Sequence, residues 1–169
     1  MKVYTDGSCL GNPGRGGWGF IAVSDNGGEL YRDGDFGGDR VTNNIMELTA
    51  MLKALRWIFS MHRACGGNVH DDNVQDIVVS ADVIVYTDSN YVRQGICSWM
   101  KKWKKNGFKS ASGGDVKNRA LWEAIDDVLT KLGDRVCVEW VRAHCGNEWN
   151  EAVDVYARAF ATPFVTLLR

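Results

Sequence analysis

Short apolar runs bounded by glycine, proline and asparagine open the chain, a pattern typical of β-strands joined by turns. They predict strands over residues 2–8, 17–24 and 29–36. Gly-Asn-Pro-Gly at 11–14 and Asn-Gly-Gly at 26–28 supply the turns between them. Because both connections are short, we expect three antiparallel neighbours in one sheet.

The rest of the chain predicts longer helices that alternate with two more strands. The elements are, in order, a helix at 42–62, a β-branched strand at 83–87, one or two helices at 89–105, a helix at 118–132, a strand at 135–141 and a helix at 148–160. Strands joined by helical crossovers run parallel, so the expected fold class is α/β, a mixed sheet with helices on its faces. No Pro/Ser-rich linker interrupts residues 1–169, which predicts a single domain.

Composition places the chain among soluble globular proteins. Its 169 residues are 45% hydrophobic and 24% charged, which excludes a disordered tail or a collagen-like fibre. No apolar run approaches the roughly 20 residues of a membrane-spanning helix, and no signal peptide opens the chain. Five cysteines without a Cys-x-x-Cys spacing favour reduced thiols and a cytoplasmic location.

The charge is unevenly distributed although the net charge is only −1. Between residues 90 and 119 a single acid, Asp115, accompanies a group of basic side chains. These are Arg93, Lys101, Lys102, Lys104, Lys105, Lys109, Lys117 and Arg119. Segregated positive charge is typical of a surface that binds a polyanion.

The tetrapeptide Val-Tyr-Thr-Asp occurs twice, and each copy ends a predicted strand with an acid, Asp6 or Asp88. Either acid alone could be an ordinary turn or helix N-cap residue. A long helix separates the two strands along the chain, so we expect them to be parallel neighbours. Adjacent strands lie about 4.8 Å apart, and two carboxylates that close repel unless a cation or a proton lies between them.

Glu47 is the third candidate acid, near the start of the helix at 42–62. One interpretation is a capping box with Asn44. On the helical wheel, however, Glu47 lies roughly 200° from the polar Thr49 and joins the apolar side. A carboxylate on a buried face needs a partner, and no Lys or Arg shares that face, so a metal ion is plausible.

Asp154 is the fourth candidate, on the helix at 148–160. It could form an ordinary i,i+4 ion pair with Arg158. Glu151 lies three residues earlier on the same face, and this like-charged pair favours a nearby cation. His144, on the loop before this helix, could reach the same end of the sheet.

Four acids and one histidine suit a hard, oxygen-ligated ion such as Mg²⁺ or Mn²⁺. Two such ions about 3.5–4 Å apart would activate water and stabilise a leaving oxygen in phosphodiester cleavage. A zinc site made of His62, Cys65 and His70 is an alternative, but its spacing matches no standard finger.

Five motifs in order make the chain resemble a type 1 ribonuclease H of the cellular, bacterial-like kind. They are Thr-Asp-Gly-Ser-Cys-Leu-Gly-Asn-Pro-Gly at 5–14, Thr-Asn-Asn-Ile-Met-Glu-Leu at 42–48, Thr-Asp-Ser-Asn-Tyr-Val at 87–92, the basic Trp-Met-Lys-Lys-Trp-Lys-Lys-Asn-Gly at 99–107, and His144-x9-Asp154 with Asn150-Glu151. The resemblance covers residues 2 to about 160, apart from an apparent insert at 63–82.

This resemblance implies a five-stranded mixed sheet, with three antiparallel strands followed by parallel ones, and hydrolysis of the RNA strand of RNA–DNA hybrids. It also implies a monomer that acts in DNA replication without a membrane. Glu151 would help set the metal environment, and His144 would move protons or aid product release. The ligands of two Mg²⁺ ions, or of Mn²⁺, would be Asp6, Glu47, Asp88 and Asp154.

The resemblance also assigns contacts to both strands of the substrate. RNA 2′-hydroxyls, which separate RNA from DNA, would be contacted by Cys9, Asn12, Asn43, Asn44 and Asn90. A DNA-strand phosphate would be gripped by Arg40, Thr42 and Asn118. A basic protrusion at about 99–110 would line the DNA channel with Trp99 and Trp103 and hold phosphates with Lys101, Lys102, Lys104 and Lys105. The two tryptophans could instead be one apolar helix face that packs on the core.

The chain departs from the family pattern in places. Ala143 stands where Gly is common, and Asn90 replaces a longer Gln, which would weaken its minor-groove contact. The insert at 63–82 is acidic, so we do not expect it to bind nucleic acid directly; it is an exposed loop or a small extension of the helix or sheet. Its apolar run at 77–79 could pack on the sheet edge or extend the next strand. Two alternatives remain: a DNA-acting nuclease or transposase of the same fold, and a non-catalytic hybrid-binding protein.

Overall fold

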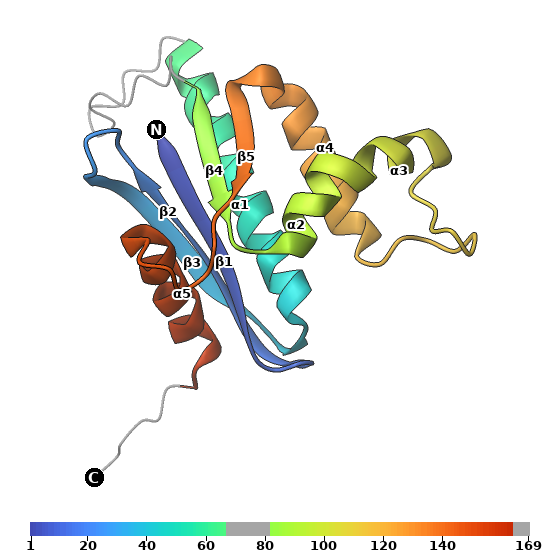
Figure 1. Ribbon diagram of the computed structural model, residues 1–169, viewed down its shortest axis with the longest axis horizontal. Helices are drawn as coiled ribbons and strands as arrows, with labels where there is room; N and C mark the ends of the chain where they lie inside the picture. The colour runs from blue at the N-terminus through green and yellow to red at the C-terminus, as the bar shows by residue number, and fades with distance from the viewer. Residues whose placement is uncertain (67–81, 164–169) are drawn as a thin grey trace.

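The computed structural model describes residues 1–66 and 82–163, and its centre is one five-stranded sheet (Figure 1). The strands are β1 (Lys2–Gly11), β2 (Gly14–Val23), β3 (Glu29–Val41), β4 (Val83–Thr87) and β5 (Val136–Trp140). Their order is β3-β2-β1-β4-β5, antiparallel across the first three and parallel from β1 through β4 to β5. The predicted mixed sheet is confirmed, including the parallel pairing of the two strands that share the Val-Tyr-Thr sequence.

Helices cover both faces of this sheet. They are α1 (Asn43–Gly66), α2 (Asn90–Gln94), the π-helical turn η1 (Gly95–Trp99), α3 (Met100–Asn106), α4 (Arg119–Leu132), the 3-10 turn η2 (Gly133–Arg135) and α5 (Glu148–Ala161). Helix α5 lies on one face, and α1, with α4 packed against it, lies on the other (Figure 1). Successive strand residues therefore enter different cores: Val3 joins the cluster on the α1 side, whereas Tyr4 packs with Val153 of α5.

The first hairpin is longer than the sequence predicts. Pairing of β1 with β2 continues to Gly11 and Gly14, and β3 runs to Val41 rather than to residue 36. Gly11 and Gly14, which signal a turn in the sequence, pair with each other across the two strands. The register of β2 against β3 is irregular between Gly14 and Gly17. The extension carries the hairpin tip to the start of α1, where Asn12 Oδ1 accepts a hydrogen bond from the Asn43 backbone N–H at 3.3 Å.

The predicted insert begins later than residue 63, because α1 continues to Gly66. The remainder, with the apolar run Ile77–Val79, lies outside the described residues apart from Asp82. The prediction of a single domain over 1–169 therefore stays a prediction. In residues 1–66 and 82–163, none of the helices is both long and apolar enough for a membrane crossing. Free thiols are found at Cys9, Cys97, Cys137 and Cys145, as expected.

Candidate active site

Asp6 and Asp88 lie side by side at one end of the two central strands. Thr5 of β1 pairs in parallel with Thr87 of β4, and each acid directly follows its threonine. Thr5 Oγ1 also donates a hydrogen bond to the Tyr86 carbonyl at 3.1 Å, which ties the strands together beside the acids. Asp6 is only 9% exposed, so its carboxylate is held in a place where charge is costly.

Asp88 is held by two groups that sequence reasoning missed. Asn150 of α5 donates from Nδ2 to Asp88 Oδ2 at 3.1 Å, and Trp140 donates from Nε1 to the Asp88 carbonyl at 3.0 Å. The N-cap of α2 is Ser89, whose hydroxyl accepts from the Val92 N–H at 3.2 Å. The N-cap interpretation of Asp88 is therefore wrong, and its carboxylate is available for chemistry.

Glu47 is oriented by two donors from different elements. Asn43 Nδ2 donates to Glu47 Oε1 at 2.8 Å, and the Ser89 hydroxyl donates to Glu47 Oε2. The capping box with Asn44 is not formed; instead Thr42 Oγ1 accepts from the Ile45 N–H at 3.4 Å at the helix start. Burial raises the pKa of Glu47, while the hydrogen bond from Ser89 lowers it.

A glycine lets α1 approach this close to β1. A Cβ on Gly7 would collide with the backbone of Met46 and Glu47, so any larger residue would push the helix away. Gly7 directly follows Asp6, and the close approach therefore brings Glu47 beside the strand-end acids.

The four acids act on one another electrostatically. Burial raises the pKa of Asp6 well above its usual range, and the charges of Asp88, Asp154 and Glu47 raise it further. In the part of the chain that the structure describes, only the Gly7 N–H lowers the pKa of Asp6, and no cationic side chain contributes. Even so, within the described ranges no group of three or more His, Cys, Asp and Glu side chains is arranged closely enough to hold a metal ion.

Asp154 does not form the alternative ion pair with Arg158: that pair is absent among the salt bridges of residues 1–66 and 82–163. The zinc alternative includes His70, which lies outside the described residues. The described residues therefore do not test the zinc alternative.

His144 lies on the loop that follows β5, which runs parallel to β4 and so delivers this loop to the end of the sheet where Asp88 lies. His144 has a left-handed backbone with φ of 50°. The Gly146 N–H donates to Glu151 Oε1 at 3.0 Å, and the Asn147 side chain caps α5 by accepting from the Asn150 N–H at 3.1 Å. Glu151 thus anchors the His144 loop.

The residues assigned to RNA contacts gather around the first hairpin and the starts of α1 and α2. Cys9 Sγ donates to the Val41 carbonyl at 3.2 Å, and Asn12 binds the Asn43 backbone, so these contacts join the hairpin to the β3–α1 junction. Asn44 and Asn90 lie in the first turns of α1 and α2, and Arg40 and Thr42 lie at the same junction.

The basic segment, residues 90–119, is less positive than its sequence indicates. Lys104 Nζ lies 2.9 Å from Asp126, and Arg119 pairs with both Asp115 and Glu123. Glu123 and Asp126 lie on α4, after residue 119, so a charge count over residues 90–119 does not include them. Among the described ion pairs none involves Lys101, Lys102 or Lys105, which are exposed.

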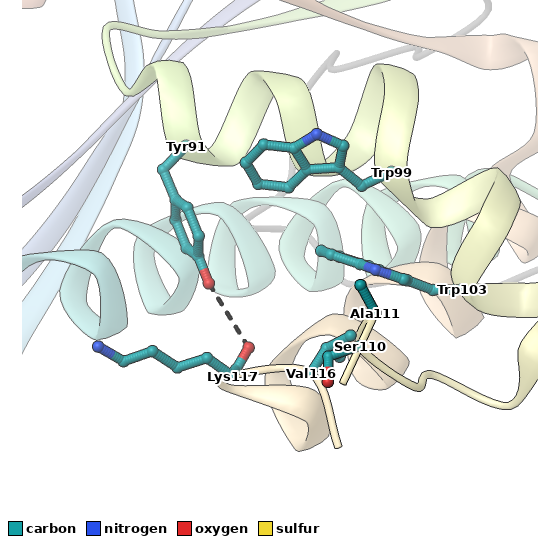
Figure 2. Close-up of a pocket in the computed structure, with 7 residues that line it drawn as sticks. All are labelled: Tyr91, Trp99, Trp103, Ser110, Ala111, Val116 and Lys117. Carbon is teal, nitrogen blue, oxygen red and sulfur yellow. Dashed lines mark hydrogen bonds between the residues drawn. The ribbon is translucent and has the colours of Figure 1, made fainter. Parts of the chain in front are cut away.

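An apolar pocket of about 380 Å³ opens beside the basic segment (Figure 2). Its lining consists of Tyr91, Trp99, Trp103, Ser110, Ala111, Val116 and Lys117. Trp103 also packs against the buried Trp122, with ring centroids 5.3 Å apart. Trp103 therefore packs on the core, as one interpretation expects, and both tryptophans line the pocket; their contact with a DNA strand stays a prediction.

The sheet order and the strand-end acids define an α/β enzyme of the RNase H fold. A family model described as RNase H matches residues 1–162. The chain is 41% identical over 159 residues to "Ribonuclease H" of Ehrlichia ruminantium (strain Gardel), covering 94% of this chain and 92% of that protein. It is likewise 41% identical over 158 residues to "Ribonuclease H" of Acidovorax sp. (strain JS42), covering 93% and 91%.

Solved structures agree with this match. LC9-RNase H1, described as a type 1 RNase H with the type 2 active-site motif, has a TM-score of 0.69 and 30% identity, covering 95% of this chain and 71% of that one. A foamy viral protease-reverse transcriptase in complex with RNA/DNA hybrid has a TM-score of 0.73 at 20% identity, covering 95% of this chain and 20% of that one. The second likeness supports the fold alone.

The chain therefore belongs to the RNase H family and is of its type 1, bacterial-like kind. Its activity is that of an endoribonuclease that hydrolyses the RNA strand of RNA–DNA hybrids, and enzymes of this family use divalent metal ions. The resemblance found in the sequence is confirmed, and the family match favours it over a DNA-acting nuclease and over a non-catalytic binding protein.

Proposed function

We propose that Asp6, Glu47, Asp88 and Asp154 hold two Mg²⁺ ions, or Mn²⁺, when substrate is bound. The observation that carries this proposal is the effect of three other carboxylates on Asp6, whose pKa burial raises first and their charges raise further. Such a cluster is unfavourable without a cation, and hard carboxylate oxygens are the donors that these ions prefer.

The surroundings of the acids fit this role. Ser89 and Asn43 orient Glu47, and Asn150 orients Asp88, as partners of metal ligands commonly do. Asn150 Oδ1 is buried and finds no hydrogen-bond partner among the described residues, so a group bound in the site could supply one. When bound, the two ions supply Lewis acid chemistry that activates water and stabilises the leaving oxygen.

His144 is proposed to move a proton during turnover or to aid product release. Its loop emerges at the acid end of the sheet, and its exposure leaves it free to approach a bound substrate. Glu151 helps set the metal environment and also anchors this loop through Gly146. Histidine is the side chain that most often acts as a general acid or base in enzymes.

Contacts to the RNA strand are proposed for five residues: Cys9, Asn12, Asn43, Asn44 and Asn90. A contact to a phosphate of the DNA strand is proposed for Arg40, Thr42 and Asn118. The 2′-hydroxyl both donates and accepts hydrogen bonds, which suits asparagine amides. One structural neighbour is described in complex with RNA/DNA hybrid.

The apolar pocket is proposed to take a deoxyribose of the DNA strand against Trp99 and Trp103. An additional ribose hydroxyl there would lose its water without gaining a partner, so the pocket would favour DNA. Lysines on the same segment would hold the flanking phosphates, chiefly Lys101, Lys102 and Lys105, which form none of the described ion pairs.

Cleavage of matched substrates tests this function. An RNA–DNA hybrid, a duplex RNA and a duplex DNA of one sequence should be incubated with the protein and Mg²⁺ or Mn²⁺, with Asp6→Asn as the control. We expect cleavage of the RNA strand of the hybrid alone, and none without a divalent ion. Equal cleavage of duplex DNA would contradict the proposal, and light scattering would test the monomeric state that we propose.

A further inference from the structure

The hydroxyl of Tyr91 forms hydrogen bonds with three groups that lie later in the chain, at residues 117–122. Asn118 Nδ2 and Trp122 Nε1 each donate to it at 3.2 Å. The hydroxyl in turn donates to the Lys117 carbonyl at 3.5 Å, the contact drawn in Figure 2. A tyrosine hydroxyl can accept two hydrogen bonds and donate one, so its whole capacity is used.

The ring of Tyr91 is fixed as firmly as its hydroxyl. It meets Trp99 edge-on at a centroid distance of 5.8 Å and Trp122 edge-on at 5.4 Å. Trp122 is fully buried, and Trp99 lines the apolar pocket together with Tyr91 itself. The hydroxyl position is therefore set by the core and not by solvent.

Asn118 is unusual for a residue that begins a helix. Asparagine at an N-cap normally accepts a hydrogen bond from the first turn of its helix. Here the side chain makes no such bond, and the residue is left-handed with φ of 60°. Its amide is turned to Tyr91 instead, and a second N–H of the same amide remains for a ligand.

We propose that Tyr91 is a positioning residue for the DNA strand: its hydroxyl aims the Asn118 amide, while its ring forms a wall of the apolar pocket. One side chain would then set the distance between a sugar in the pocket and its phosphate at Asn118. This inference rests on the proposed phosphate contact of Asn118.

Tyr91→Phe tests the inference because it removes the hydroxyl and keeps the ring. The effect should be in hybrid binding: KM should rise about fivefold while kcat at saturation stays within twofold. Because the Asn118 amide is neutral, its loss releases no counterion, and the slope of log K against log salt should stay nearly unchanged. Asn118→Ala should give the same pattern.

Two further variants separate positioning from stability. The double variant Tyr91→Phe, Asn118→Ala should bind the hybrid no more weakly than Asn118→Ala alone, because both substitutions remove the same phosphate contact. Trp122→Phe removes the other donor to the hydroxyl, and below its melting temperature it should keep normal KM and salt slope. By NMR the Asn118 side-chain amide should lose its protection from hydrogen exchange in Tyr91→Phe and keep it in Trp122→Phe.

The outcomes distinguish the inference from the function on which it rests. Normal binding by Asn118→Ala would contradict the phosphate contact itself and the inference with it. Weak binding by Asn118→Ala with normal binding by Tyr91→Phe would overturn the inference alone. Additive losses in the double variant, or an equal KM increase in Trp122→Phe, would also overturn it.

Discussion

Asn150 on α5 donates a hydrogen bond to the carboxylate of Asp88 at the end of β4, although 62 residues separate them in the chain. Asn150 is only 2% exposed, so water cannot readily replace this bond. The contact fixes one oxygen of a proposed metal ligand and links the helix that carries Asp154 to the strand that carries Asp88.

Replacing Asn150 should therefore impair turnover more than substrate binding. Asn150→Ala is expected to lower kcat about 10–100-fold, the usual cost of removing a partner of a metal ligand. KM for the hybrid should change little, and the Mg²⁺ concentration for half-maximal activity should rise. Mg²⁺ titrations of initial rates measure all three quantities, and an unchanged Mg²⁺ dependence would contradict the assigned role.

Asp6→Asn should abolish cleavage and stabilise the fold at neutral pH. Because the fold raises the pKa of Asp6, the folded state binds this proton more tightly than the unfolded chain. The resulting cost is absent below the ordinary carboxyl pKa of about 3.9 and grows as pH rises toward the raised value. Each 1 kcal/mol of relief should raise Tm by about 2–4 °C.

Thermal unfolding of both proteins at pH 7 and pH 3 without metal measures this difference. The advantage of Asp6→Asn should be present at pH 7 and should vanish at pH 3. Asp88→Asn should also lose activity. Near-normal turnover by either variant would refute the metal-ligand assignment.

The lysines of the basic segment should differ in how much each contributes to hybrid binding. Lys101→Ala, Lys102→Ala and Lys105→Ala should each weaken hybrid binding and reduce the log–log salt slope by up to about 0.7–0.9. Lys104→Ala is the matched control, since Lys104 already pairs with Asp126 and should contribute less. Equal slopes for all four variants in binding titrations would show that this ion pair does not restrain Lys104.

His144→Ala should reduce turnover without removing metal binding. A general acid–base group contributes about 10²–10⁴-fold, and we expect a loss near the lower end. Isothermal calorimetry should give nearly unchanged Mg²⁺ affinity. A loss of Mg²⁺ binding as complete as that of Asp6→Asn would instead make His144 a ligand.

The sequence by itself determined the order of the elements, the mixed sheet and the neighbourhood of Asp6 and Asp88. These features follow from local patterns: apolar runs, turn residues, and two matching strands whose parallel pairing places their ends together. Strand ends were less predictable, because Gly11 and Gly14 belong to a local turn pattern and pair with each other only within the assembled sheet.

Only the tertiary structure decided which side chains hold the acids and which cations are engaged. Asn150, which holds Asp88, and Ser89, which holds Glu47, lie far from these acids in the chain, as does the Asp126 that pairs with Lys104. Tyr91 meets Asn118 across 27 residues in the same way. No periodicity encodes such contacts, since they depend on how helices settle on the sheet after its strands have paired.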